Sequence, residues 1–311
     1  MLNGKKDLLG IKELTAEEIA LILDLAGDMK KVVLSDDKKL GTLKGLSVVT
    51  LFYENSTRTR LSFELASKYM SASSANITAS GSSVQKGESL LDTGHTIDRM
   101  GTDIIIMRHQ CSGAAHCLAK NIKAGVINAG DGMNEHPTQA LLDALTIKEH
   151  KGGFKGLRVA IVGDVLHSRV ARSNLYLLNK MGASVILAGP STLMPKGIET
   201  LGAEVTNDVD KAVSGADVII NLRIQLERQK SALFPTVREY SSRFGLNERR
   251  LALAAKDALV MHPGPVNRGV EMNSAVIDCD QSFIDEQVTN GVSVRMAILD
   301  LLTRGKQSAA D

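Results

Sequence analysis

The chain has 311 residues, of which 43% are hydrophobic and 23% are charged, and its net charge is +2 at pH 7. This length favours two domains, and the composition is that of a globular, soluble protein. Aromatic residues make up only 3% and tryptophan is absent, which together with the weak charge argues against a nucleic-acid-binding protein. Basic residues concentrated at particular loops suit a small acidic ligand better.

The cysteines and the apolar runs indicate a cytoplasmic protein that does not cross a membrane. Cys111, Cys117 and Cys279 have neither paired nor zinc-type spacing, so we expect free thiols in a reducing compartment. No apolar run approaches the roughly 18 residues of a membrane span, and the first residues lack the apolar core of a signal peptide.

Strands and helices alternate along the first half of the chain. A capping box at Thr15–Glu18 opens the first helix. Pro137, well placed in a first helical turn, opens another helix that runs to about residue 149. The expected strands lie near residues 46–53, 75–78, 103–107 and 125–129.

A second series of strands and helices follows the break at residues 150–156. Its strands are expected near residues 157–163, 183–188, 217–221 and 258–261, before a last helix at about 292–304. The alternation predicts an α/β protein of two domains, each a mainly four-stranded parallel sheet flanked by helices. The turn after the fifth strand, Gly163–Ser168, is not GxGxxG, so a dinucleotide fingerprint is absent.

The segment Ser56–Arg60 lies where an apolar strand ends and an amphipathic helix begins. Ser56 or Thr57 would cap this helix, whose free N–H groups and positive dipole end favour an anion. Two hydroxyls and two guanidinium groups crowd the same point, so we predict a phosphate site there. The alternative is an ordinary capped helix with solvated arginines.

Basic and amide side chains also follow most of the other expected strands. Because ligands of open α/β sheets bind beyond the carboxyl ends of the strands, these residues predict a positively lined cleft for anionic small molecules. Neither a pair of carboxylates nor a Ser-His-Asp or Cys-His arrangement occurs among them. The segments after the strands contain Arg108, His109, Asp131, His136, Gln139, His167, Arg169, Arg172, Arg223, Gln225 and His262–Pro265.

Some of these residues also have a structural explanation. His136 alone would more often be a buried structural histidine, although Pro137 and Gln139 beside it favour a role in binding. One of Arg169 and Arg172 is expected to be a solvated charge on a helix face. From composition alone, Lys86 belongs to an ordinary loop.

Residues 52–64 closely resemble the carbamoyl-phosphate motif of the transcarbamoylases, and further motifs of this family recur in order along nearly the whole chain. The resemblance implies a carbamoyl-phosphate domain of residues 1–137 and about 290–311. It implies an amino-acid-binding domain of about 150–289 and a connecting helix at 137–149. The last helix would return to pack on the first domain.

The residues that receive the amino acid resemble the aspartate branch of the family more than the ornithine branch. The loop that begins at Lys86 resembles the corresponding loop of the aspartate enzymes, and Arg223–Gln225 resembles the site where those enzymes bind the carboxylates of aspartate. The ornithine enzymes typically carry a cysteine in the motif that here reads His262–Pro265. The cationic side chains of Lys86, Arg169 and Arg223 would attract the two carboxylates of aspartate and repel the cationic side chain of ornithine. Gly264 departs from the leucine of part of the family, and the roles of Arg268 and Arg172 stay open.

This resemblance implies transfer of the carbamoyl group from carbamoyl phosphate to L-aspartate, without a metal, a cofactor or a covalent intermediate. Catalysis would rest on positioning and electrostatics. Carbamoyl phosphate would be held by Ser56, Thr57, Arg58, Thr59, Arg108, His136, Gln139, Gly264 and Pro265, and aspartate by Lys86, Arg169, Arg223 and Gln225. The catalytic group would comprise Arg58, Thr59, Lys86, Arg108 and His136.

The family's lysine is supplied by a neighbouring subunit, so the resemblance implies a homotrimer with shared active sites. Association with regulatory chains or a dihydroorotase stays open. We also hypothesise that Glu54 pairs with Arg169 or Arg228 across the domains. The rival functions are an ornithine carbamoyltransferase and a catalytically silent relative that serves as an assembly subunit. A P-loop kinase is excluded because GxxxxGK[ST] is missing.

Overall fold

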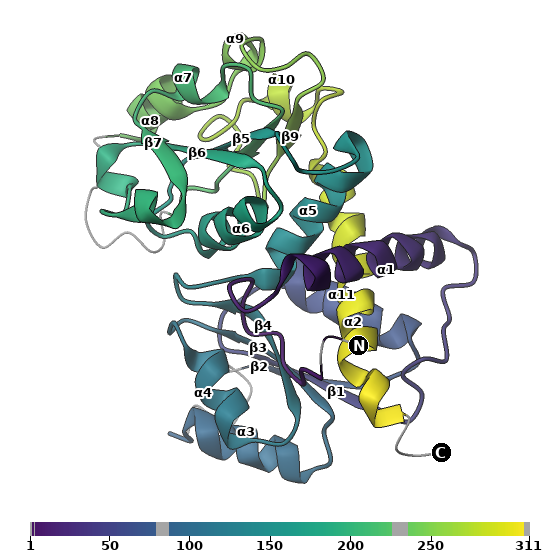
Figure 1. Cartoon of the computed structure of the whole chain (residues 1–311). Helices are drawn as coiled ribbons and strands as arrows, with labels where there is room; N and C mark the ends of the chain where they lie inside the picture. The colour runs from purple at the N-terminus through teal and green to yellow at the C-terminus, as the bar shows by residue number, and fades with distance from the viewer. Residues whose placement is uncertain (1, 3, 79–86, 226–235, 308–311) are drawn as a thin grey trace. The chain divides into compact units, whose positions relative to one another are not determined.

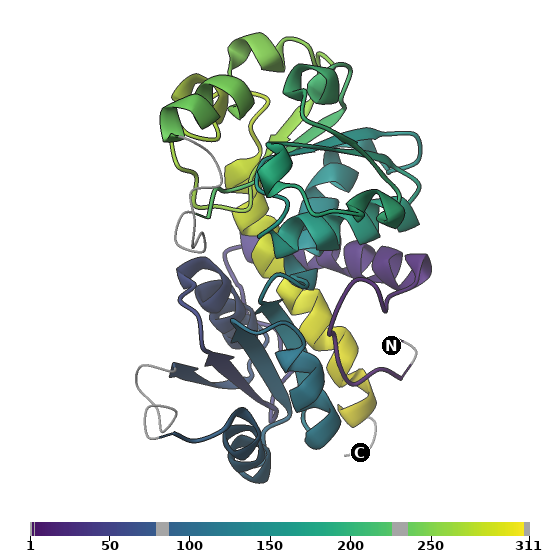
Figure 2. The same cartoon turned by 90° about the vertical axis from the view of Figure 1, so that its left-hand side faces the viewer.

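A computed structural model describes residues 2, 4–78, 87–225 and 236–307 of the chain. The chain forms two compact units (Figures 1 and 2). Unit 1 contains Met1–Leu145 and Val288–Asp311, and unit 2 contains Thr146–Gln287. The finer domain boundaries near residues 137, 150 and 290 stay a prediction. None of the helices in the described part of the chain has the length and apolarity that a membrane crossing requires.

Unit 1 is built around a four-stranded parallel sheet in the order β2-β1-β3-β4. Helices α3 and α4 cover one face of this sheet and bury a cluster that includes Leu51, Ile105, Val126 and Leu118 (Figure 1). The elements of the first 151 residues are α1 (Ala16–Leu34), β1 (Ser47–Phe52), α2 (Thr57–Tyr69), β2 (Ser73–Thr78), α3 (Leu90–Arg99), β3 (Ile104–His109), α4 (Ala114–Asn121), β4 (Gly125–Asp131) and α5 (Pro137–Lys151).

The register of this sheet brings the polar strand ends to one edge. Phe52, the last residue of β1, pairs with Arg108 of β3, and His109 pairs with Asp131 of β4. Since all four strands are parallel, the loops that follow them leave the sheet on the same side. The segment at residue 56 and the segment that follows residue 131 therefore belong to the same end of unit 1.

Unit 2 has a five-stranded parallel sheet in the order β7-β6-β5-β8-β9. Its strands are β5 (Arg158–Val162), β6 (Ser184–Ala188), β7 (Ala203–Thr206), β8 (Val218–Asn221) and β9 (Leu259–Met261). Its helices are α6 (Arg169–Lys180), α7 (Val209–Val213), α8 (Val237–Phe244), α9 (Glu248–Leu251) and α10 (Ser274–Ile277), with 3₁₀ turns η3 (Ser191–Leu193) and η4 (Ile198–Leu201). Helix α11 (Ile284–Gln307), yellow in Figure 1, begins in unit 2 and ends in unit 1.

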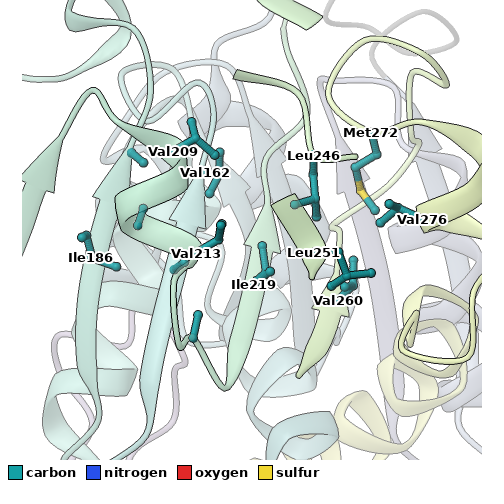
Figure 3. Close-up of a cluster of buried hydrophobic side chains, with 14 residues drawn as sticks. Val162, Ile186, Val209, Val213, Ile219, Leu246, Leu251, Val260, Met272 and Val276 are labelled. Atoms are coloured by element: carbon teal, nitrogen blue, oxygen red, sulfur yellow. The ribbon is translucent and has the colours of Figure 1, made fainter. Parts of the chain in front are cut away.

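One face of the second sheet packs on a core of aliphatic side chains from α7, α9 and α10 (Figure 3). Val162, Ile186, Ile219 and Val260 come from four neighbouring strands and are all at most 2% exposed. Their β-branched side chains fit the pleated surface of a buried parallel sheet. Each βα connection therefore leaves its polar residues at the carboxyl end of a rigid strand.

The predicted fold class is confirmed: both units are α/β with parallel sheets, and the C-terminal helix returns to unit 1. The second sheet carries one strand more than the four predicted. The additional strand β7 lies at the edge, is four residues long and has only one buried residue, Ala203. So short and polar a segment has too little apolar alternation to be predicted as a strand.

Candidate active site

The segment Ser56–Arg60 forms the start of α2, directly after the carboxyl end of β1. Ser56 is the N-cap residue in an extended conformation, yet its side chain makes no capping hydrogen bond. The first turn contains no acidic residue. Ser56 is therefore the N-cap residue, as one of the two predicted candidates, but its hydroxyl leaves the helix N–H groups without a capping bond. The positive end of the helix is also not neutralised by a carboxylate in its first turn. Thr59 is buried, whereas Thr57 and Arg58 are exposed.

Arg108 lies beside this segment because β3 pairs with β1. Its Nη1 donates to the carbonyl oxygen of Ala129 at 3.3 Å, and its Nε lies 3.3 Å from Oε2 of Glu54. The side chains of Arg108 and Glu54 are only 14% and 18% exposed, so this ion pair is poorly screened by water. Glu54 thus pairs within its own unit. Its hypothesised pairing across the domains stays a hypothesis, and Arg228 lies outside the described residues.

The loop between β4 and α5, which carries His136, is fixed by two buried carboxylates. Asp131 accepts hydrogen bonds from the Gly113 backbone at 2.6 Å and from Asn128 Nδ2 at 2.8 Å. Glu135 accepts one from the Ile11 backbone at 2.7 Å, 124 residues away in sequence. The sequence predicts this positioning role for neither carboxylate, because the Gly113 and Ile11 backbone groups that they bind lie 18 and 124 residues away.

His136 and Gln139 lie in and just after this loop, and both are buried, at 4% and 8% exposure. Gln139 donates from Nε2 to Oδ1 of Asp143 at 2.9 Å. Since a carboxylate only accepts, this bond fixes which end of the amide is the nitrogen and directs Oε1 away from Asp143. Gln139 is thereby prepared to accept a hydrogen bond from a ligand.

In unit 2, the turn after β5 and the start of α6 hold the predicted cations. Ser168 caps α6 by accepting from the Ala171 backbone at 3.2 Å. His167 Nδ1 lies 2.9 Å from Oδ1 of the fully buried Asp164. Arg169 is only 3% exposed, whereas Arg172 is partly exposed. Of the two arginines, Arg172 is therefore the one on the more solvated face.

The segments after β8 and β9 lie side by side in unit 2 because these two strands pair. Arg223 and Gln225, both partly buried, follow β8, and the His262–Pro265 turn follows β9. The Gly264–Pro265 peptide bond is cis. Arg268 makes a bidentate bond to Asp278 at 2.8–2.9 Å, with both side chains more than half exposed. Arg268 is thus engaged in a surface ion pair rather than in the turn.

The structure gathers the predicted residues at the carboxyl ends of two sheets. Unit 1 holds Ser56–Thr59, Arg108, His136 and Gln139, and unit 2 holds Arg169, Arg223, Gln225, Gly264 and Pro265. Lys86 lies outside the described residues. Within the described part of the chain, no three His, Cys, Asp or Glu side chains are grouped so that they could hold a metal ion. Each unit therefore presents cations, amides and backbone groups suited to an anionic ligand.

Two family models match the chain. The carbamoyl-phosphate-binding domain of aspartate/ornithine carbamoyltransferases matches residues 6–149, and the aspartate/ornithine-binding domain of the same family matches residues 155–302. The match covers both units and follows the same division into two halves.

The chain is also similar to named proteins over almost its full length. It is 68% identical to the aspartate carbamoyltransferase catalytic subunit of Ruminiclostridium cellulolyticum, covering 96% of both chains. It is 64% identical to that of Acetivibrio thermocellus, covering 98% of this chain and 97% of the relative.

Solved structures of both branches of the family share the fold. The aspartate transcarbamoylase of Trypanosoma cruzi in complex with carbamoyl aspartate and phosphate has a TM-score of 0.86 at 30% identity, covering 96% of this chain and 97% of that one. The ornithine carbamoyltransferase of Pyrococcus furiosus has a TM-score of 0.84 at 32% identity, covering 95% and 96%. The fold alone therefore does not separate the two acceptor amino acids.

Proposed function

Since this chain belongs to the aspartate/ornithine carbamoyltransferase family, we propose that it transfers the carbamoyl group of carbamoyl phosphate to L-aspartate. The products are N-carbamoyl-L-aspartate and phosphate, and the reaction is the committed step of de novo pyrimidine synthesis. The observation that carries this proposal is the 64–68% identity, over at least 96% of the chain, to relatives named aspartate carbamoyltransferase catalytic subunits.

Carbamoyl phosphate binds to the end of unit 1 that carries α2. Backbone N–H groups and side chains of Ser56–Thr59 hold the phosphate at the positive end of the helix. Thr59, Arg108 and His136 polarise the carbamoyl oxygen, where negative charge develops during attack. Gln139 accepts a hydrogen bond from the carbamoyl NH₂, consistent with the orientation that Asp143 gives its amide.

Unit 2 supplies the aspartate-binding groups and two carbonyl oxygens. Arg169, Arg223 and Gln225 hold the two carboxylates of aspartate, and the carbonyls of Gly264 and Pro265 hold the carbamoyl NH₂. The aspartate amine attacks the carbamoyl carbon, and the departing phosphate accepts the amine proton. No covalent enzyme intermediate or metal ion takes part in this proposed mechanism, which relies on orientation and charge stabilisation.

We also propose a homotrimer in which Lys86 of one subunit completes the aspartate site of its neighbour. We place the enzyme in the cytoplasm because its three cysteines are free thiols. Whether a regulatory chain or a dihydroorotase binds the trimer is open.

Two experiments test the proposal. Purified enzyme is given carbamoyl phosphate with either aspartate or ornithine, and the ureido product is identified; N-carbamoyl-aspartate is expected, and citrulline would establish the ornithine alternative. The absence of both products would favour the silent relative. Next, the inactive variants Lys86→Ala and Arg108→Ala are dissociated, mixed and reassembled. Recovery of activity is expected only if active sites are shared between subunits, and no recovery would contradict the shared site.

A further inference from the structure

The backbone of the His262–Pro265 turn, which follows β9, is held by side chains. Because Pro263 and Pro265 have no N–H group, the turn has two backbone donors, those of His262 and Gly264. The His262 N–H donates to Oε1 of Gln287 at 2.9 Å, and the Gly264 N–H donates to Nδ1 of His262 at 2.8 Å. His262 and Gln287 are 2% and 3% exposed, so water competes little for these bonds.

Gly264 needs this support because of its backbone conformation. Its φ is +63°, in the left-handed region that glycine adopts without a steric penalty. Glycine also loses more conformational entropy on folding than any other residue. The bond from the Gly264 N–H to the imidazole therefore selects one conformation of an otherwise permissive position. Among the described residues, none donates a hydrogen bond to the carbonyl oxygen of Gly264 or of Pro265.

Glu271 fixes the imidazole from its other side. Its Oε1 lies 3.2 Å from Nε2 of His262, and the same oxygen accepts from the Asn267 backbone at 2.7 Å. Glu271 is fully buried, and the next residue, Met272, lies in the core cluster of unit 2 (Figure 3). The backbone carbonyl of Glu271 accepts from Asn221 Nδ2 at 2.6 Å, at the end of β8.

The two contacts of the imidazole agree on one tautomer. Nδ1 faces an N–H donor and must be the bare nitrogen, while Nε2 faces a carboxylate and must carry the proton. We infer that His262, oriented by Glu271, is a positioning residue that holds the Gly264–Pro265 carbonyls in place for the carbamoyl NH₂. This inference rests on the function proposed above, and it adds two residues, His262 and Glu271, that do not touch the substrate.

The same network reaches the aspartate-binding segment. Asn267 donates from Nδ2 to Oε2 of Glu271 at 3.3 Å and to the Ile224 carbonyl at 3.5 Å. Ile224 stands between Arg223 and Gln225. Glu271 therefore supports both the carbonyl turn and the segment after β8, whereas the two ring nitrogens of His262 contact the turn and Glu271 itself.

Two substitutions at His262 separate these bonds. In His262→Asn, Oδ1 takes the place of Nδ1 and still accepts from the Gly264 N–H. In His262→Gln, the amide takes the place of Nε2, which keeps the contact to Glu271 and loses the one to Gly264. We expect the KM for carbamoyl phosphate to be about tenfold higher in the Gln variant than in the Asn variant, the scale of one lost hydrogen bond. The KM for aspartate should be alike in both.

The matched control is Arg268→Gln, in the same loop, which should leave both KM values within about twofold because exposed ion pairs contribute little. Equal KM values for carbamoyl phosphate in the Asn and Gln variants, with equal melting temperatures, would overturn the inference.

The tautomer gives a readout that does not depend on activity. Long-range ¹H–¹⁵N spectra of histidine-labelled enzyme, with His262 identified by its loss in His262→Asn, should show a bare Nδ1 and a protonated Nε2. A proton on Nδ1 would refute the inference whatever KM values the two variants have. If the protein transfers no carbamoyl group but shows this tautomer, the proposed function is refuted. The hydrogen bonds from Glu271 through His262 to Gly264 would then still be supported.

Discussion

Replacing Arg108 with alanine removes a charge and its contacts from the carbamoyl-phosphate half of the site. The lost contacts include the bond to the Ala129 carbonyl and the ion pair with Glu54, both at 3.3 Å. With the side chain only 14% exposed, the guanidinium acts in surroundings of low dielectric, where it stabilises a developing negative charge more than it would in water. Losing one such donor costs about 10²–10³ in kcat, or about 2.7–4 kcal/mol.

The assay measures the release of phosphate and the formation of N-carbamoyl-aspartate at saturating substrates. We expect kcat to fall further than KM rises, because the proposed role is strongest in the transition state. Arg108→Lys should recover part of the loss, since it keeps the charge but not the planar fork. The control Arg99→Ala removes an exposed arginine at the end of α3 and should leave kcat within about twofold. A folded Arg108→Ala enzyme with kcat within about fivefold of the parent would refute the role.

Three further substitutions test the surroundings of the site and the stability of the two units. Asp143→Asn frees the Gln139 amide to turn over, and kcat/KM for carbamoyl phosphate should fall about tenfold; an unchanged value would contradict the orienting role. Gly10→Ala places a Cβ too close to Glu135 Oε1 and displaces this carboxylate from its hydrogen bonds, so urea denaturation should show a loss of about 1–3 kcal/mol; no loss would contradict the packing of that carboxylate. Hydrogen bonds from two arginines lower the pKa of Asp210 to about 2, so its contribution to stability is present above about pH 4 and disappears as the pH falls towards 2. The melting temperature of Asp210→Asn should thus lie below that of the parent at pH 7, and the gap should narrow below pH 4; a gap that widens would be the wrong sign.

Most of the fold could be predicted because its signals are local. Apolar strands such as residues 46–53 and the amphipathic helix that follows them carry their periodicity within ten or twenty residues. Parallel strands then place the residues after each strand at one edge, which is why the sequence alone assigns Ser56–Arg60 and Arg108 to one place. Strand β7 could not be predicted because four residues, of which only Ala203 is buried, are too few to show such a pattern.

The residues that support the site could not be found in this way. Glu135 binds the backbone of Ile11, and nothing in the residues around either position indicates the other. His262 stands out as part of a motif, but its bond to Gly264 depends on the side-chain orientation that Glu271 sets. Ser56 shows the opposite case: its type is typical of a helix cap, yet in the fold its hydroxyl does not cap the helix. Local sequence predicts the groups at a strand end, while their tautomers and partners depend on tertiary contacts.

The most direct test is a competition between two amino acids for the carbamoyl group. Enzyme, carbamoyl phosphate and equal concentrations of aspartate and ornithine are incubated together, and both ureido products are quantified by mass spectrometry. Because the side chains proposed to bind the amino acid are arginines and an amide, N-carbamoyl-aspartate should form in large excess over citrulline. Citrulline as the main product would contradict the assignment of Arg169, Arg223 and Gln225 to the carboxylates of aspartate.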